Sequence, residues 1–220
     1  MKLKSIETDN KPPPMPVIDQ SIKEEFEYLA NYLGVLILFQ TAKKIEEAPP
    51  VGNDCFELKD QNVEFSENGK VCTSLNQGFK WVIGKHGYSQ GVYAFEFEIL
   101  KLLNNNWMFL GILDSTPERN YNDHYSYAWK GCYGWAGGSQ VSIDGAHNPG
   151  KDGYNEKNDF LENDTIILTL NLEQNTLTFE NKRNGKKYVL GIPSNKIWKI
   201  HVNIYGNGDK IRFAKQSKIK

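Results

Sequence analysis

Residues 91–99 read GVYAFEFEI, and the alternation within this stretch decides the fold that the sequence predicts. Successive side chains of a β-strand point to opposite faces. One face of such a strand is wholly apolar and comprises Tyr93, Phe95, Phe97 and Ile99. The other face carries Val92, Ala94, Glu96 and Glu98. This division predicts a strand with one buried side and one wet side.

The two carboxylates also raise an enzymatic alternative. Glu96 and Glu98 would lie roughly 7 Å apart, because a strand rises about 3.3 Å per residue, and glycoside hydrolases use spacings of this order. A sugar-cleaving site would also need an apolar setting for its general acid, whereas the neighbours on this face are only Val92 and Ala94. Leu100 stands where jelly-roll glycosidases of this kind carry a third acidic residue. The pattern favours a structural sheet face, with a carbohydrate-binding or carbohydrate-cleaving jelly roll using Glu96 and Glu98 as the alternative.

Further strand patterns follow one another from residue 55 to residue 213. Residues 106–114, NWMFLGILD, are apolar on both faces, as in a central strand. In the later stretches the side chains expected to face inward are Val141, Ile143, Ile166, Leu168, Leu170, Leu172, Leu177, Phe179, Trp198, Ile200, Val202 and Ile204. His201, Asn203 and Tyr205 are expected to point outward. No helical pattern separates the strands, so the sequence predicts an all-β antiparallel sandwich.

The 220-residue chain is long enough for one such domain and an N-terminal extension. Residues 1–20 are charged and then proline-rich, which predicts an extended or disordered lead. A helical extension is expected over residues 21–50, because Ser21 and Glu24 fit a capping box. Apolar residues then recur at helical spacing, namely Ile22, Phe26, Leu29, Leu33 and Leu36, and this stripe is expected to pack on the sandwich or on a partner. Residues 33–44 are left open between helix and strand, and residues 214–220 form a basic tail.

Composition argues against several classes of function. The net charge of -1 and the pI of about 6.4 do not suit a nucleic-acid binder. No apolar run approaches the roughly 20 residues of a membrane span, and the first residues lack the apolar core of a signal peptide. Three cysteines are odd in number and widely spaced, which fits free thiols. We therefore expect a cytoplasmic or nuclear protein.

Motifs for catalysis and for metal binding are missing from the sequence. It contains no HExxH, GxSxG, P-loop or GxGxxG pattern. Residues 148–159 resemble a calcium loop only at Asn148, Asp152, Gly153 and Asp159, and Gly150 stands where an oxygen ligand is needed. We expect no catalytic residue, no metal and no cofactor.

Seven stretches in chain order together resemble a SPRY domain. They are VEFSENGKVCTS, VIGKHGYSQGVYAFEFEI, NWMFLGILD, CYGW, SIDG, DTIILTLNLEQNTLTFENKRNG and HVNIYGNGDKI, and the match as a whole covers residues 55–213. Asn163 and Asp164 stand where the family usually has Gly-Asp. The resemblance implies a bent antiparallel β-sandwich that binds a protein or peptide through its loops and has no catalysis. Such domains often serve ubiquitin ligases or scaffolds, although residues 1–54 carry no RING or B-box cysteine pattern and no SOCS box is expected after the domain. The oligomeric state stays open.

The resemblance also implies a binding surface formed by loops at one end of the sandwich. These loops correspond to residues 67–69, 104–106, 116–130 and 205–206. Glu67 stands where peptide-capturing members carry a basic residue, so an acidic peptide is not expected there. The candidate partner-binding residues are Asn104, Asn105, Asn106, Arg119, Tyr121, Tyr125, Trp129, Tyr205 and Gly206.

The residues themselves favour the same loop. Residues 114–131 read DSTPERNYNDHYSYAWKG and place tyrosine, tryptophan and arginine outside any strand pattern, and these residue types dominate interface energetics. The alternative is that Tyr127 and Trp129 fold into the core as loop anchors. Gly206 and Gly208 would let a partner backbone approach closely. The expected partner is an extended peptide or loop, held by asparagine hydrogen bonds and by stacking on tyrosines.

Overall fold

Alternating apolar side chains from residue 56 onward form two antiparallel sheets that share one core. The structure is a computed structural model of the chain and describes residues 28–29, 54–103, 107–155 and 160–219. The chain divides into two units, Met1–Glu47 and Ala48–Lys220. In the first unit only Tyr28 and Leu29 are described, and both are helical. The rest of the proline-rich lead and of the expected helical extension, including residues 33–44, lies outside the described residues.

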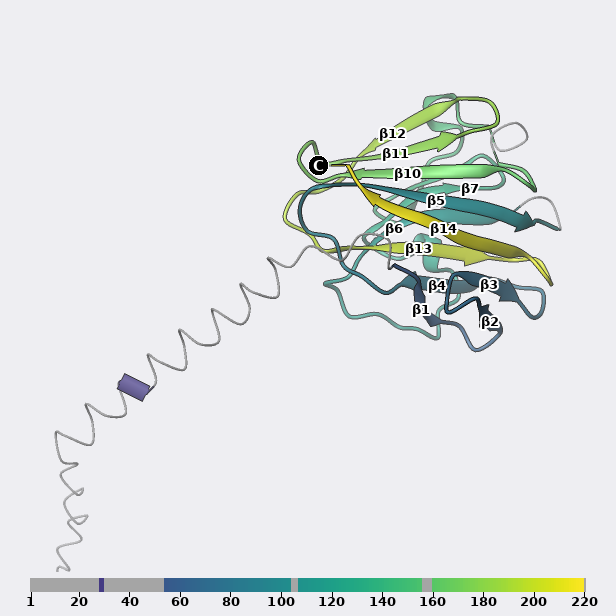
Figure 1. Cartoon of the computed structure of the whole chain (residues 1–220), viewed down its shortest axis with the longest axis horizontal. Coiled ribbons are helices and arrows are strands. Elements are labelled where there is room, and N and C mark those ends of the chain that lie inside the picture. Colours follow the sequence, from purple (N-terminus) through teal and green to yellow (C-terminus); the bar gives the residue numbers. More distant parts are fainter. Residues whose placement is uncertain (1–27, 30–53, 104–106, 156–159, 220) are drawn as a thin grey trace, which may run out of the picture. The chain divides into compact units, whose positions relative to one another are not determined.

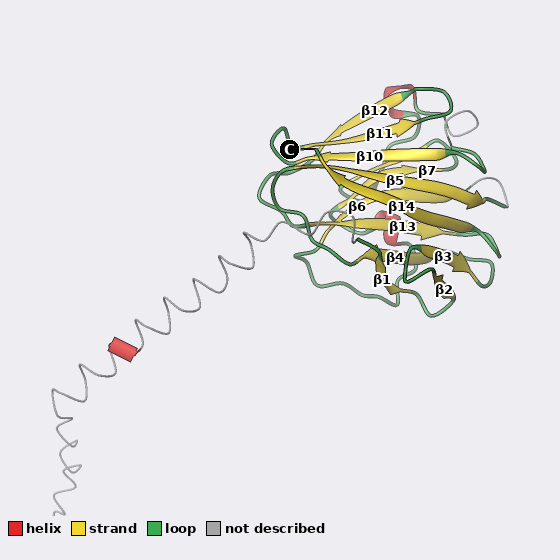
Figure 2. Cartoon of the chain, viewed as in Figure 1, coloured by secondary structure: helices red, strands yellow, loops and turns green. Residues whose placement is uncertain are grey.

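The described part of the second unit contains fourteen strands and two short helical turns (Figure 2). In order across the first sheet, the strands are Phe56–Lys59 (β1), Lys80–Gly84 (β4), Trp198–Ile204 (β13), Met108–Asp114 (β6), Cys132–Ala136 (β7), Gln140–Ile143 (β8) and Ala146–His147 (β9). Across the second sheet they are Lys187–Gly191 (β12), Thr176–Asn181 (β11), Thr165–Asn171 (β10), Val92–Lys101 (β5), Lys210–Lys218 (β14), Val71–Ser74 (β3) and Val63–Ser66 (β2). The helical turns are Ser126–Ala128 (η1) and Lys151–Gly153 (η2).

The GVYAFEFEI strand lies at the centre of the second sheet. β5 pairs with β10 on one side and β14 on the other, and Figure 1 shows these three strands side by side in front of β6 and β7. Its apolar face is fully buried at Tyr93, Phe95 and Phe97, as alternation predicts. β6, expected to be central, is the middle strand of the first sheet and is buried along its whole length.

The carboxylates on the opposite face of β5 are surface residues held in ion pairs. Glu96 lies 2.7 Å from the Nζ atom of Lys182, and Glu98 lies 2.8 Å from a guanidinium nitrogen of Arg212. The same guanidinium also contacts Glu67, at 2.9 Å. This network is the charged outer face of a sheet and offers no apolar setting for a general acid.

Two turns illustrate how local sequence shapes the second sheet. Glu67, Asn68 and Gly69 all have positive φ in the hairpin between β2 and β3, as the Asn-Gly pair predicts. Asn163, the departure from the usual glycine of the SPRY pattern, has φ of 67°, a conformation that asparagine tolerates better than most residues. The adjoining Asp164 is buried and lies 2.5 Å from the Nε atom of Arg183. β14 continues through Lys218, into the residues that the sequence assigns to a basic tail.

One expectation about the outer face of the first sheet holds in direction but not in exposure. β13 buries Trp198, Ile200, Val202 and Ile204 as predicted, but His201 and Asn203, expected to point outward, are completely buried. They do lie on the face away from the shared core. That face is covered, because residues 115–131 fold across it and form a second apolar cluster. The cluster comprises Trp81, Ile83, Phe109, Leu113, Trp129, Cys132 and Ala136, with Trp107 and Tyr127 packed against it.

The described residues also bear on the expected chemistry. They contain no group of three or more His, Cys, Asp or Glu side chains that could hold a metal ion. All three cysteines are free, and burial raises the pKa of Cys72 and of Cys132, which disfavours their reactive thiolate forms. Within the same residues, no helix combines the length and the hydropathy that crossing a membrane requires.

Candidate functional site

The segment of residues 115–131, termed the long loop below, is closed at its base by Arg119. One guanidinium nitrogen donates to the carbonyl oxygen of Lys130 at 3.0 Å, and the other donates to the carbonyl oxygen of Asp114. The guanidinium also lies 5.5 Å from the ring of Trp129, which is only 7% exposed. Arg119 and Trp129, both candidate partner contacts, therefore act first as internal supports of the loop.

The middle of the long loop is fastened to two neighbouring strands. The indole nitrogen of Trp81 on β4 donates to the carbonyl oxygen of Tyr121 at 3.0 Å. From β13, the amide nitrogen of Asn203 donates to the carbonyl oxygen of His124 at 2.9 Å and to the hydroxyl of Ser126 at 2.6 Å. These bonds satisfy the amide nitrogen of buried Asn203, whereas its Oδ1 atom has no hydrogen-bond partner among the described residues.

Gly145 allows the loop to pack this closely. A Cβ atom at this position would lie 2.5 Å from the carbonyl oxygen of Ala128 and 2.6 Å from that of Trp129. Gly145 also has φ of 79°, in the turn between β8 and β9. Only glycine combines that backbone conformation with the missing side chain, so this turn sets how near the loop approaches the sheet.

Beneath the loop lies a cysteine–histidine–serine constellation that resembles a catalytic one. The Nδ1 atom of His201 is 3.4 Å from Cys132 Sγ, and its Nε2 atom is 2.9 Å from Ser126 Oγ. All three residues are completely buried, and the Trp129 ring stacks on His201 with centroids 6.1 Å apart. Burial, aided by the positive charge of Arg119, lowers the pKa of His201 to about 3, so the imidazole is neutral near pH 7. A group sealed from solvent in this way fastens the loop to the sheet.

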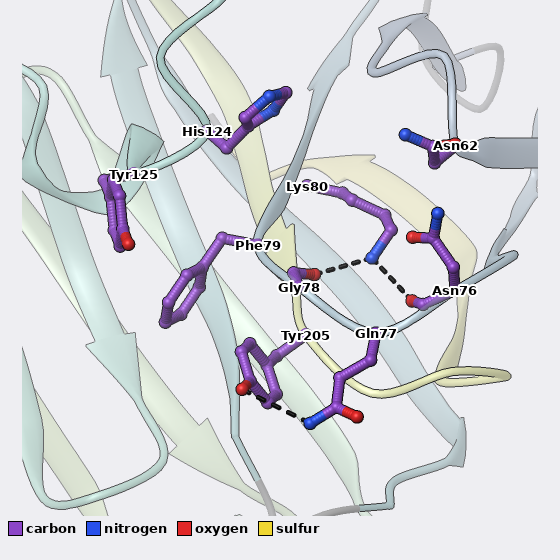
Figure 3. Close-up of a pocket in the computed structure, with 9 residues that line it drawn as sticks. All are labelled: Asn62, Asn76, Gln77, Gly78, Phe79, Lys80, His124, Tyr125 and Tyr205. Atoms are coloured by element: carbon purple, nitrogen blue, oxygen red, sulfur yellow. Dashed lines mark hydrogen bonds between the residues drawn. The ribbon is translucent and has the colours of Figure 1, made fainter.

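The second half of the long loop borders an open pocket of about 420 Å³, termed the first pocket (Figure 3). It is lined by Asn62, Asn76, Gln77, Gly78, Phe79, Lys80, His124, Tyr125 and Tyr205. Phe79 is the centre of its aromatic wall, with Tyr125 and Tyr205 at centroid distances of 5.0 and 4.8 Å. Trp107 and Tyr127 extend this wall at 4.7 and 5.3 Å from Phe79. The result is a continuous aromatic platform contributed by four separate stretches of chain.

The opposite wall of the first pocket is polar. The Nζ atom of buried Lys80 donates to the carbonyl oxygens of Asn76 and Gly78, each at 2.6 Å (Figure 3). Burial lowers the pKa of Lys80, and the negative charges of Asp60 and Asp209 oppose this shift. The one ammonium is thus offset within the protein, and it presents no unbalanced charge to a ligand.

His124 links the long loop to the polar wall. Its Nδ1 atom lies 2.6 Å from a carboxylate oxygen of Asp60, which is almost completely buried in the turn between β1 and β2. The same carboxylate accepts a hydrogen bond from the backbone N–H of Asn62 at 2.8 Å. Both walls of the first pocket are therefore held in place before any ligand arrives.

The predicted site residues do not all meet at one place. Tyr125, 55% exposed, and the half-buried Tyr205 line the first pocket, whereas Tyr121 lines a separate hollow on the outer face of the same sheet. Gly206 adjoins Tyr205, but its N–H donates to Asp209 at 2.5 Å, and a Cβ atom there would lie 2.6 Å from that carboxylate. It serves the turn into β14. Asn104, Asn105 and Asn106 lie outside the described residues.

The residues around the first pocket differ in two ways from the binding surface that the sequence predicts. Glu67 and the hairpin of residues 67–69 are absent from its lining; residues 76–80 take that place. Phe79 and Trp107 were not singled out by the sequence analysis. The signal for Phe79 was present, because residues 78–84, GFKWVIG, alternate so that Phe79, Trp81 and Ile83 share one face.

No protein-family model matches the chain, and no curated protein matches it by sequence. Solved structures do match. The SPRY domain of human HERC1 superposes with a TM-score of 0.52 at 16% identity, covering 74% of this chain and 99% of that one. The PSpry domain of TRIM65 gives 0.55 at 14% identity, covering 74% and 90%. The NHR1 domain of Drosophila melanogaster neuralized gives 0.50 at 13% identity, covering 76% and 99%. The domain therefore has the SPRY fold, as the resemblance in the sequence implied.

Proposed function

We propose that this domain is a non-enzymatic protein–protein interaction module that binds an extended peptide or loop in the first pocket. The partner lies between the aromatic platform and the polar wall. Tyr125 and Tyr205 form its apolar contact, and the side-chain amides of Asn76 and Gln77 are within the same pocket for hydrogen bonding to a peptide backbone.

The main support for this proposal is that the aromatic platform is partly exposed to solvent although its rings are firmly packed. Tyr125 keeps 55% of its surface exposed while packing against Phe79. Tyrosine rings held in this way supply contact area at low cost in conformational entropy. Because the long loop is already fastened to β4 and β13, little further ordering is needed when a partner binds.

The charge distribution favours a partner segment without strong charge at this pocket. Lys80 is the only buried cation of its lining and is offset by Asp60 and Asp209. His124 is engaged with Asp60. A neutral peptide with one apolar side chain and free backbone amides matches these walls.

The absence of catalysis is part of the proposal and has structural support. The carboxylate pair of β5 is neutralised by Lys182 and Arg212, and the cysteine–histidine–serine constellation is sealed under Trp129. A role in substrate recognition for a ubiquitin ligase or scaffold extends the proposal, on the ground of the SPRY resemblance alone. Free thiols suit the cytoplasmic or nuclear location that we also propose.

Affinity capture from a cell lysate, with bound proteins identified by mass spectrometry, tests this function. The bait is the full chain, and the matched variants are Tyr205→Ala in the first pocket and Val189→Ala on the exposed outer face of the second sheet. We expect one or more proteins to be retained by the wild type and by Val189→Ala but lost with Tyr205→Ala. Retention by Tyr205→Ala together with loss in Val189→Ala would place binding on the other sheet. Recovery of ligase subunits among the retained proteins would support the extended role.

A further inference from the structure

The first half of the long loop borders a second, smaller hollow that the proposed function does not use. Its volume is about 120 Å³, and it spans β1, β4, β13 and β6, which are adjacent in the first sheet. It is lined by Leu58, Ile83, Leu113, Ser115, Pro117, Arg119, Tyr121 and Lys199. We call this surface the apolar–basic groove.

Exposed apolar side chains gather around this groove. Leu58 is 41% exposed and Tyr121 is 46% exposed, and both line it. Ile197, 38% exposed, adjoins it, because its carbonyl oxygen accepts hydrogen bonds from the backbone N–H and the hydroxyl of Ser115. Apolar groups clustered at a surface mark an interaction site more often than apolar groups scattered singly. Since a cavity of about 150 Å³ accommodates benzene, this groove has room for about one aliphatic side chain.

Neither cation of the groove forms an ion pair with a carboxylate, although the negative charge of Asp114 acts on Arg119. The guanidinium of Arg119 donates to two carbonyl oxygens, and the Nζ atom of Lys199 donates to the carbonyl oxygen of Lys85 at 3.1 Å. No acidic side chain lines the groove; the carboxylate of nearby Asp114 is paired with Lys196 at 2.8 Å.

On the second sheet, by contrast, three cations are paired with carboxylates. There Lys182, Lys187 and Arg212 each contact a carboxylate, at 2.7, 2.9 and 2.8 Å. The groove on the first sheet therefore keeps positive charge available beside an apolar floor, where a negative charge from a partner would be favoured.

We propose that the apolar–basic groove is a second docking site, which takes an aliphatic side chain flanked by carboxylates in an acidic–hydrophobic segment of a protein partner. The aliphatic side chain packs among Leu58, Pro117 and Tyr121. The flanking carboxylates lie near Lys199 and Arg119. The site is separate from the first pocket and does not depend on the function proposed for it.

Three synthetic peptides, added to the isotope-labelled full chain and followed by NMR, test the proposal. The first is acetyl-Asp-Glu-Leu-Glu-Asp-amide, the second has Ser in place of Leu, and the third has Lys and Arg in place of the acidic residues. We expect the first peptide to shift the resonances of Leu58, Ile83 and Tyr121 and to bind at least about fivefold more tightly than the others. Raising the salt from about 50 mM to about 500 mM should weaken it, because exposed charges are screened.

Two substitutions separate the apolar part of the recognition from the charged part. Leu58→Ser should weaken the first peptide at least about fivefold, the scale of a modest interface contact. Lys199→Glu should weaken binding of the first, acidic peptide and strengthen binding of the third, basic peptide. Lys215→Glu, an exposed lysine of β14 on the other sheet, is the matched charge control and should change neither. Tyr205→Ala should leave binding of the first peptide unchanged, which separates this site from the first pocket.

Several outcomes would overturn the proposal. They are the absence of shifts at millimolar peptide, equal binding of all three peptides, and shifts centred on Tyr125 and Tyr205. A dimer in sedimentation velocity that Leu58→Ser dissolves would instead assign the groove to a second copy of this chain.

Discussion

The two sheets of the sandwich present opposite kinds of outer face. The outer face of the second sheet is polar and charged, and its acidic residues Glu96, Glu98 and Glu180 all contact cations. The outer face of the first sheet is aromatic, and the long loop covers part of it and leaves pockets beside the covered part. One sheet therefore closes its surface with ion pairs, whereas the other leaves apolar surface exposed.

The largest expected effect concerns the core that both faces share. Phe97 is completely buried and packs on Phe213 with ring centroids 4.8 Å apart. Phe97→Ala should lower the free energy of unfolding by about 3–5 kcal/mol, because it removes a buried ring and leaves a cavity. A denaturant titration measures this, and a loss below about 1 kcal/mol would contradict the assignment of the core.

The next largest effect is a dependence of stability on pH that arises from His201 beneath the long loop. In the folded chain the pKa of His201 is about 3, against 6.5 for the free side chain, mainly because of burial. Between these values the unfolded chain binds the proton more readily, so stability is fully present above about pH 6.5 and falls as the pH drops toward 3. The cost is up to about 1.4 kcal/mol per pH unit.

His201→Gln provides the comparison for this measurement. The variant should be less stable at neutral pH, but its free energy of unfolding should vary less with pH below about pH 6.5, because the titrating imidazole is gone. Identical pH slopes for the wild type and the variant would show that His201 is not buried under the loop.

Substitutions at two glycines separate the stability cost of disturbing the long loop from the cost of backbone strain. Gly145 and Gly185 both have positive φ, 79° and 69°, but only Gly145 lacks room for a Cβ atom. Gly185→Ala should cost about 1–2 kcal/mol from the backbone alone. Gly145→Ala should cost about 1–3 kcal/mol more, from the added overlap with the loop. Thermal or denaturant unfolding measures both, and equal losses would mean that the loop is not packed against this turn.

Tyrosine substitutions on the outer face of the first sheet test whether a partner binds there. Tyr125→Ala and Tyr205→Ala should each weaken a captured partner by about 1–3 kcal/mol, with nearly unchanged melting temperatures, because both rings are partly exposed. Tyr121→Ala should weaken only a partner that also reaches the apolar–basic groove. Titration calorimetry measures the affinities, and wild-type affinity in both Tyr125 and Tyr205 variants would exclude the first pocket.

The smallest effect is expected for substitutions on the charged outer face of the second sheet. Glu96→Gln combined with Glu98→Gln should change stability by no more than about 1 kcal/mol, because these ion pairs are partly exposed and surface pairs contribute little. Partner binding should be unaffected. Hydrolysis of a β-glucan by the wild type that is lost in the double variant would revive the carbohydrate alternative.

Strand alternation was enough to predict the shared core, because a residue such as Phe95 or Leu168 faces inward whatever covers the other side. It was not enough for His201 and Asn203. Whether their face is wet depends on the long loop, which begins at residue 115, 86 residues before His201. The same long-range packing buries Trp129, a candidate partner contact, so that it supports the loop. It also brings Phe79 and Trp107 into contact and places Tyr205 beside Phe79. Contacts between such distant segments leave no local periodicity to detect.

The central claim is that partners bind at the loop end of the first sheet and not on the face of the second. Cross-saturation NMR with a captured partner measures this directly, because it reports which residues of the domain touch the partner. The claim predicts signal loss at Phe79, Tyr125 and Tyr205, with no change along the outer face of β5, β10 and β11. Signal loss centred on Glu96, Thr169 and Thr178 of the second sheet, with Tyr125 and Tyr205 unaffected, would contradict it.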